Sequence, residues 1–508
     1  MSSRTENSIK NLASKLTVSI VMILLGFITR KIFVDNIGVQ YLGLNGLLKN
    51  ILGIMTLLEG GFATSVVYNM YKPLAQDDRP KILALLQLYR RVYRWIALGV
   101  VLFGVCLYPF LGYFLKDAED LDYVGVVYFI FLFNSVINYF SAYKWSLINA
   151  SQQVYKLTTI NLCYQIGVSL TKLAILYFTK NYILYLCVEA VFNILYNIAV
   201  VKKANELFPY VRTRESYEVD NDTKNNIITN IKALFVNRVG GYFMHSTDNI
   251  IISAFVGVAS VGLYSNYTLV TGFVKSMVNQ ALDSYSESVG NLISLENSSK
   301  IYSVFKSCFF VNYVTVSVPI IVLVNVFPSL INWWLGGEYN MDKLIVWIIL
   351  LNFYVDSIRI TAMTFKTKAG LFVQDKWTPF IQGVINVVLS LFLVRKWGLA
   401  GVLIATAISI LAIGFWQMPR LCYKYIFNKP LWDYFKRLAF YTSIGLLALW
   451  VSGLICSLIQ LRQPFWGMIC NGIITSLVLA ALYWLFFHKL EEYSEIKKYV
   501  RSLINNMF

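Results

Sequence analysis

The residues with the clearest chemical potential are charged side chains that lie inside long apolar stretches. The basic ones are Arg30, Lys31, Lys49, Lys172, Arg238, Lys275 and Arg359. The acidic ones are Glu59, Glu189, Asp248 and Asp356. A charge at the centre of a bilayer costs at least about 2.5–3.5 kcal/mol on insertion scales. So many charges therefore predict a polar cavity inside the protein.

The surplus of bases over acids favours an anionic ligand. Arginine stays charged at any depth and can hold a phosphate through two parallel hydrogen bonds. A pyrophosphate that crossed lipid alone would face a Born penalty of tens of kcal/mol, which a cation-lined cavity would offset. Lys31, near the outer end of its span, can instead reach the membrane interface. The candidate substrate-binding cations are Arg30, Lys49, Lys172, Arg238, Lys275 and Arg359.

The acidic residues allow two interpretations. Glu59, Asp248 and Asp356 are candidates for coupling to a proton or sodium gradient, and each could instead pair with a base. Asp356 and Arg359 are three residues apart on one helical face, which is the spacing of an internal ion pair. No metal site is expected, because the chain has only two histidines and its seven cysteines form no C-x-x-C pair.

The elements that position these residues must be membrane helices. The chain of 508 residues is 57% hydrophobic and only 14% charged, and its mean hydropathy is +0.59. Soluble domains carry about 25% charged residues. We predict an all-α polytopic membrane protein with about fourteen spans, each near the 20 residues that a crossing needs. The predicted spans are 13–34, 43–69, 94–115, 122–143, 157–179, 181–201, 231–256, 262–283, 306–331, 343–365, 377–395, 398–419, 436–459 and 465–488.

The distribution of basic residues predicts the orientation in the membrane. With the N-terminus inside, the inner segments hold 31 Lys and Arg residues and the outer loops hold 6. This asymmetry predicts a multi-pass inner-membrane protein with both termini in the cytoplasm. It also accounts for the net charge of +17 through contact with anionic membrane lipids, so no nucleic-acid partner is expected.

An internal repeat predicts the domain organisation. Residues 38–44, GVQYLGL, match residues 257–263, GVASVGL, at an offset of 219, and 178–190 loosely match 393–405 at an offset of 215. We predict an N-lobe of six helices (1–215), a C-lobe of six helices (216–430), two extra helices (431–488) and a cytoplasmic amphipathic tail (489–508). Six helices is an even number, so the two halves would be parallel repeats, which typically bind substrate where they meet.

An enzyme is not expected from this pattern. The longest predicted outer loop, 332–343, is about twelve residues long. It is too short for an external catalytic domain. The chain also contains no phosphate-cradling Walker motif, which argues against ATP hydrolysis.

Several stretches resemble bacterial Wzx-like oligosaccharide flippases of the multidrug/oligosaccharidyl-lipid/polysaccharide exporter superfamily. The most specific are 26–33, GFITRKIF, and 37–47, IGVQYLGLNGL. Supporting stretches are 58–62 with 71–74, 248–252, and 368–372 through 398–401. The resemblance covers about residues 8–420. Where family members often carry Glu-Leu-Gly, this chain has Glu59-Gly60-Gly61.

The resemblance implies two six-helix lobes in a V shape, with two helices appended. It implies alternating access driven by an ion gradient, without a bound cofactor. The implied substrate is an undecaprenyl-pyrophosphate-linked oligosaccharide for capsule, O-antigen or exopolysaccharide synthesis, and Arg30 and Arg238 lie where cavity cations are expected. Polysaccharide polymerase and chain-length machinery are candidate partners, and we expect a monomer.

Three alternatives remain open at this point. A multidrug exporter of the same superfamily would usually have twelve helices and an acidic cavity. A peptidoglycan-precursor flippase would share both the fold and the cationic cavity. A membrane polysaccharide polymerase or ligase would need a larger outer loop than this chain offers.

Overall fold

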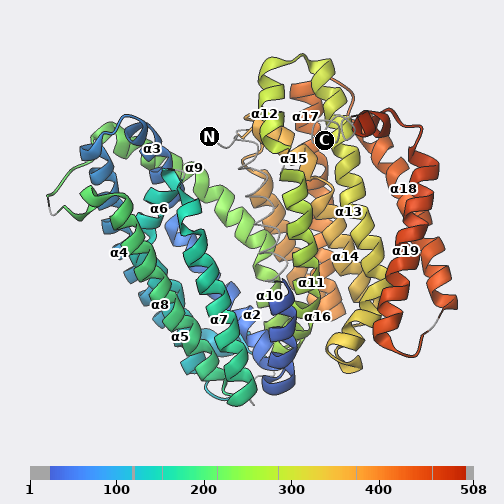
Figure 1. The fold of residues 1–508 in the computed structure, drawn as a ribbon, viewed down its shortest axis with the longest axis horizontal. Coiled ribbons are helices and arrows are strands. Elements are labelled where there is room, and N and C mark those ends of the chain that lie inside the picture. The colour runs from blue at the N-terminus through green and yellow to red at the C-terminus, as the bar shows by residue number, and fades with distance from the viewer. Residues whose placement is uncertain are drawn as a thin grey trace. The chain divides into compact units, whose positions relative to one another are not determined.

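The computed structural model describes residues 23–116, 121–151, 153–213, 215–283, 285–372, 374–459 and 461–498. These residues form helices joined by short turns, and no strand occurs among them (Figure 1). The all-α class predicted from the apolar stretches is therefore confirmed. Within the described residues, nine helices are long and apolar enough to cross a membrane, or ten if the bent pair Val124–Phe140 and Ala142–Ala150 is one span.

The predicted fourteen spans all coincide with helical segments in their described parts. The smaller count of nine or ten has three causes. Only residues 23–34 of the first predicted span, 13–34, lie within the described part of the chain. One 50-residue helical stretch, Thr378–Phe427, contains two of the predicted spans. The predicted spans 231–256 and 262–283 are also more polar, because they hold Arg238, Asp248 and Lys275.

Packing divides the chain into two compact units, Met1–Gly262 and Leu263–Phe508, and the boundary falls inside α11. Unit 1 begins with a helix at residues 23–37. Its other helices are α2 (Val39–Gly53), η1 (Ile54–Glu59), α3 (Phe62–Ala75), α4 (Arg79–Leu107), η2 (Tyr108–Phe114), α5 (Val124–Ile137), η3 (Asn138–Phe140), α6 (Ala142–Ala150), η4 (Val154–Leu157), α7 (Thr158–Phe178), α8 (Tyr182–Leu207), η5 (Pro209–Arg212), α9 (Asn221–His245), α10 (Thr247–Phe255) and the first residues of α11 (Val258–Asp283).

Unit 2 holds the rest of α11 and the remaining helices. These are α12 (Ser286–Leu295), α13 (Ser298–Trp334), η6 (Gly337–Tyr339), α14 (Lys343–Ser357), α15 (Ile360–Lys368), α16 (Thr378–Ser409), η7 (Ile410–Gly414), α17 (Phe415–Cys422), η8 (Tyr423–Phe427), α18 (Trp432–Leu458) and α19 (Pro464–Phe487). The two predicted extra helices correspond to α18 and α19, which pack side by side (red in Figure 1). The predicted repeat boundary near 215 precedes α9, whereas α9 and α10 pack within unit 1.

The tight turn predicted between residues 179 and 181 is confirmed. Lys180 has a φ of 52°, and Asn181 caps α8 by accepting a hydrogen bond from the Leu184 amide at 2.9 Å. A residue with positive φ reverses the chain within a few atoms, and an asparagine at the N-cap satisfies a backbone donor that has no partner inside the helix. The helices α7 and α8 therefore form an antiparallel hairpin.

A second hairpin is hidden inside α16. The backbone breaks at Gly398, where φ is 53° and ψ is −131°, so the residues on either side form separate arms. The Asn386 side chain donates to Thr406 Oγ1 at 2.9 Å across the two arms. A side chain on Gly401 would collide with the carbonyl of Leu393 at 2.2 Å, so the backbones cross closely beside the turn. The predicted pair 377–395 and 398–419 is therefore confirmed as a hairpin.

Aromatic packing stabilises the core of unit 2. Phe305, Phe309, Tyr434 and Tyr441 are all buried and belong to one cluster between α13 and α18. The tail helix at 491–498 also packs against this cluster through Tyr493 and Ile496, as does Leu490 just before it. The predicted amphipathic face thus packs on the protein in the described part of the tail, and the remaining tail residues lie outside the described ranges.

Acidic residues of the tail helix add polar anchors. Glu491 pairs with Lys306 at 3.3 Å, Glu492 forms an ion pair with Arg437, and Glu495 accepts a hydrogen bond from Ser303 at 3.1 Å.

Candidate functional site

Three of the predicted cations gather in unit 1, and we call this set, with one carboxylate, the basic cluster: Arg30, Lys49, Lys172 and Glu189. Lys172 forms an ion pair with Glu189, and its ammonium lies 4.4 Å from the centroid of the Tyr185 ring. Lys49, exposed on α2, lies within electrostatic range of the other three members. The cluster holds three bases and one acid, so its formal charge is +2.

The α7–α8 hairpin positions half of this cluster. Lys172 lies eight residues before Lys180, and Glu189 lies eight residues after Asn181. The antiparallel hairpin therefore places Lys172 and Glu189 at the same distance from the turn, on neighbouring helices. Glu189 was not among the predicted site residues. Its equal distance from the turn is the sequence signal that could have identified it as the partner of Lys172.

A row of hydrogen-bonded amides continues from the cluster along α8, and we call it the amide ladder: Asn134, Asn138, Asn193 and Asn197. The Nδ2 atoms of Asn193 and Asn197 donate to the Oδ1 atoms of Asn134 and Asn138, each at 3.0 Å. Positions 189, 193 and 197 are four residues apart and therefore share one face of the helix. Three of the four asparagines are half-buried and Asn138 is exposed, so the ladder presents polar groups at a surface of unit 1.

A second charged group in unit 1 contains Arg238 and Glu59. The guanidinium Nη1 of Arg238 lies 3.7 Å from Glu59 Oε2, and its Nη2 donates to Thr64 at 3.5 Å. The Tyr93 hydroxyl also donates to Glu59, at 3.3 Å. The pair is formally neutral. The structure therefore assigns Arg238 a carboxylate partner rather than a place in the basic cluster.

The third charged group lies in unit 2, where Asp356 binds two bases. It forms ion pairs with Lys275 and with the Nη2 atom of Arg359. Arg359 is 5% exposed and also donates to Gln382 Oε1 at 3.4 Å. The expected pairing of Asp356 with Arg359 is thus present, and Lys275 joins it from α11.

The helical segment that packs against this third group changes locally from α-helix to π-helix. Residues Ile410–Gly414 form a π-helix, a feature that is frequent at functional sites. A side chain on Gly414 would meet the Arg359 guanidinium at 2.2 Å and Gln382 Oε1 at 2.5 Å. The absence of a side chain at Gly414 therefore leaves room for the buried guanidinium, which a larger residue would displace together with Gln382.

The remaining predicted residues are placed as follows. Asp248 is buried on α10, with 8% of its surface exposed. Lys31 is exposed and pairs with Asp35 at 3.3 Å, so it lies outside the basic cluster. No group of His, Cys, Asp and Glu side chains suited to a metal ion occurs in the part of the chain that the structure describes.

Comparison with solved structures finds the same fold in membrane flippases and transporters. The lipid II flippase MurJ, in an inward closed conformation, aligns with a TM-score of 0.69 and 15% identity over 93% of this chain and 98% of that chain. An inward-facing multidrug resistance MATE family transporter of the MOP superfamily aligns with a TM-score of 0.61 and 11% identity over 80% and 98%. The MATE multidrug transporter DinF-BH, in complex with rhodamine 6G, aligns with a TM-score of 0.56 and 15% identity over 82% and 96%.

At these identities the likeness establishes the fold. The chain therefore has the polytopic all-α fold that is found in a lipid flippase and in MATE transporters. Comparison of the sequence finds no protein-family model and no curated protein that matches this chain.

Proposed function

We propose that this protein flips a polyprenyl-(pyro)phosphate-linked oligosaccharide from the inner to the outer leaflet of the bacterial cytoplasmic membrane, by alternating access. The product would serve synthesis of a capsule, O-antigen or exopolysaccharide. The basic cluster is the observation that carries the proposal. It places three bases against one carboxylate among helices rich in apolar residues, and a phosphate would complete its charge balance.

The amide ladder supports a substrate that carries a glycan. Amide groups both donate and accept hydrogen bonds, as sugar hydroxyls do. From Glu189 to Asn197 the ladder face extends about 12 Å along α8. A phosphate at the basic cluster would therefore place the first sugars beside these asparagines.

The comparisons support two related candidates. The likeness to MurJ, a lipid II flippase, favours a peptidoglycan precursor as an alternative lipid-linked substrate. The likeness to MATE transporters favours a multidrug exporter. The formal charge of the three groups is +2, 0 and +1, and this surplus disfavours a cationic drug.

The orientation, energy source and partners belong to the same proposal. Both termini would be cytoplasmic, and an ion gradient would drive the cycle. Glu59 and Asp356 are each held by an arginine, which favours structural roles for these two carboxylates. We propose Asp248 as the coupling carboxylate, on its burial in α10. The partner machinery would be a polysaccharide polymerase and its chain-length regulator.

The most direct test deletes the gene in its host and identifies the lipid-linked glycan that accumulates on the inner leaflet. Wild-type protein should restore surface polysaccharide, whereas Arg30→Gln and Lys49→Gln should not. Lys31→Gln is the matched control, because Lys31 follows Arg30 directly but is exposed and paired with Asp35. Membrane levels of each variant should be equal by immunoblot. Normal surface polysaccharide in both cluster variants would contradict the proposal.

Binding to the purified protein separates the candidates. Undecaprenyl pyrophosphate should bind more tightly than undecaprenyl phosphate, and Arg30→Gln should weaken the former by about tenfold or more, since a charged hydrogen bond contributes about 1.5–3 kcal/mol. If this protein restored growth of a strain that lacks its lipid II flippase, the peptidoglycan precursor would be favoured as the substrate. Tight binding of rhodamine 6G that is unaffected by Arg30→Gln would favour the multidrug exporter.

A further inference from the structure

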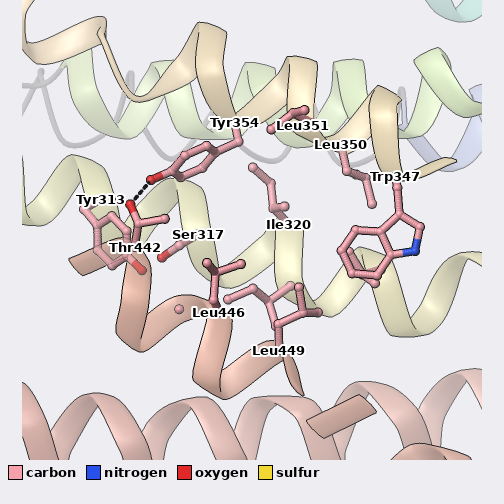
Figure 2. A pocket seen from close by; sticks show the side chains of 13 residues that line it. Tyr313, Ser317, Ile320, Trp347, Leu350, Leu351, Tyr354, Thr442, Leu446 and Leu449 are labelled. Carbon is pink, nitrogen blue, oxygen red and sulfur yellow. Dashed lines mark hydrogen bonds between the residues drawn. The ribbon is translucent and has the colours of Figure 1, made fainter. Parts of the chain in front are cut away.

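Two adjoining cavities lie within unit 2, between α13, α14 and α18. The first, which we call the apolar groove, has a volume of about 290 Å³ and is lined mostly by aliphatic and aromatic side chains (Figure 2). The second, the polar chamber, has a volume of about 600 Å³ and extends toward the turn between α13 and α14. Both are lined by Val324, Trp347 and Leu350, so they form one continuous depression.

The apolar groove offers almost no hydrogen bonds, because the few hydroxyl groups that line it are already engaged. Tyr354 and Thr442 are hydrogen-bonded to each other at 2.6 Å, as Figure 2 shows. The Tyr313 hydroxyl donates to the Tyr441 carbonyl at 2.6 Å, and Ser317 is bonded to Tyr483 at 2.8 Å. A hydrocarbon chain is therefore a suitable occupant of this part.

The length of the groove matches one leaflet of a membrane. Its wall on α13 extends from Tyr313 to Val324, a rise of about 16 Å. Half of a hydrocarbon core of about 30 Å is about 15 Å. An acyl chain of a single leaflet would therefore lie along the groove and bring its glycerol end to the polar chamber.

The polar chamber supplies groups that suit a lipid headgroup. Lys343 lines it, is exposed, and has no carboxylate at ion-pair distance among the described residues. Asn471 also lines it, and its buried Oδ1 accepts no hydrogen bond, whereas its Nδ2 donates to the Asn325 carbonyl at 3.2 Å. The chamber therefore offers a cation for a phosphate and a free acceptor for a hydrogen-bond donor.

We propose that this depression binds one glycerophospholipid of the surrounding leaflet, with an acyl chain in the apolar groove and the headgroup in the polar chamber. The phosphate lies at Lys343, and a headgroup hydroxyl or ammonium donates to Asn471. Phosphatidylglycerol and phosphatidylethanolamine carry such a donor, whereas phosphatidylcholine does not. This lipid is a resident of unit 2, so its binding is independent of the transported substrate.

Native mass spectrometry of the purified full-length protein tests the proposal by titration with phospholipids of identical acyl chains. Leu446→Trp fills the groove and should weaken phosphatidylglycerol binding by more than about tenfold, because the indole ring displaces acyl methylenes from their apolar contacts. Leu454→Trp is the matched control, because it lies on the same helix and is likewise exposed but lines neither cavity. Equal binding by Leu446→Trp and wild type would overturn the proposal.

The headgroup is tested separately. Lys343→Ala should weaken the binding of all three phospholipids, because the phosphate is common to them. Lys396→Ala, which removes another exposed lysine of unit 2, should leave their binding unchanged. Asn471→Leu should remove the preference for phosphatidylglycerol and phosphatidylethanolamine over phosphatidylcholine. The absence of any headgroup preference in wild type would contradict the assigned role of Asn471.

The identity of the occupant is tested by competition on the wild-type protein, with the conservative variant Trp347→Phe used only to isolate the signal. Phosphatidylglycerol with brominated acyl chains should quench the fluorescence of Trp347. This quenching is measured as the difference in fluorescence loss between wild type and Trp347→Phe. Undecaprenyl phosphate at equal concentration should leave this quenching intact. If undecaprenyl phosphate instead abolished it, the groove would hold the prenyl chain and the phospholipid assignment would be wrong.

Discussion

Gly43 and Gly262 lie against each other's helices in a reciprocal contact. A side chain on Gly43 would approach the Val258 carbonyl to 1.9 Å, and one on Gly262 would approach the Val39 carbonyl to 2.1 Å. Both pairs of equivalent positions, 43 with 262 and 39 with 258, are separated by the repeat offset of 219. The two copies of the repeated turn therefore contact each other through the same atoms, as in an isologous interface.

Both glycines should resist even the smallest side chain. Gly43→Ala or Gly262→Ala must push two helix backbones apart, so each should lower stability by about 1–3 kcal/mol. Thermal unfolding in detergent measures this loss. The control is Gly272→Ala, on the same helix as Gly262, where nothing lies within 4 Å of the added atom. Equal melting temperatures for all three variants would show that the close approach does not constrain the fold.

Neutralising Asp356 should strongly destabilise unit 2. Asp356→Asn would leave Lys275 and buried Arg359 together without their shared counter-charge, and breaking a buried pair in this way costs about 3–5 kcal/mol. Lys275→Gln should cost less, because its side chain is 38% exposed and Arg359 still holds the carboxylate. The comparison uses unfolding temperatures, with Asp35→Asn in the exposed pair as control. A smaller loss for Asp356→Asn than for Lys275→Gln would contradict the shared-counterion role.

Arg238 should stabilise the fold through its ion pair with Glu59 rather than bind substrate. Arg238→Gln and Glu59→Gln should each reduce stability, and the double variant should lose less than the sum, with a coupling of about 0.5–3 kcal/mol. Stability and undecaprenyl pyrophosphate binding are both measured across the cycle. If only the variants that lack Arg238 weakened binding, and no coupling appeared in stability, Arg238 would be a substrate cation, as first predicted.

Asp220 should stabilise the start of α9 over the whole physiological pH range. Its side chain accepts hydrogen bonds from the Thr223 amide at 2.9 Å and from the Thr223 hydroxyl, which lower the pKa of Asp220 from 3.8 to about 2. Because the folded pKa lies below the ordinary value, the stabilisation is complete above about pH 4 and is lost as pH falls through about 2.

Hydrogen exchange of the first turn of α9 measures this effect. Asp220→Ala should destabilise that turn by about 0.5–2 kcal/mol, equally at pH 7 and pH 5.5, whereas Asp220→Asn should be nearly neutral because asparagine is also a good N-cap. The ion pair with Lys81, at 3.1 Å, is exposed and should add little. A strong change between pH 7 and pH 5.5 would show that another group controls this turn.

The helices were predictable because apolar run length and charge content are local properties. The hairpin at Lys180 also follows from local sequence, and counting outward from that turn would have paired Lys172 with Glu189. The hairpin in α16 was predictable for the same reason, since glycine at 398 separates two apolar runs of bilayer length.

The partners of the remaining charges could not be predicted from one sequence. Lys275 and Asp356 are 81 residues apart, and their pairing depends on how α11 packs against α14. The same holds for Glu59 and Arg238, which were assigned to different roles although the structure pairs them. The sign of each charge is known from the sequence, but the residue that neutralises it depends on how the helices pack.

The two copies of the repeated turn share their glycine contact but differ in their charged residues. At the offset of 219, the position equivalent to Arg30 is Asn249, and the position equivalent to Lys49 is Thr268, so the second copy lacks both cations. A scaffold with twofold character would otherwise offer a ligand two equivalent orientations. Because only one copy carries these bases, the proposed substrate-phosphate site would occur once per chain, and a transported molecule would enter with one polarity and a stoichiometry of one per chain.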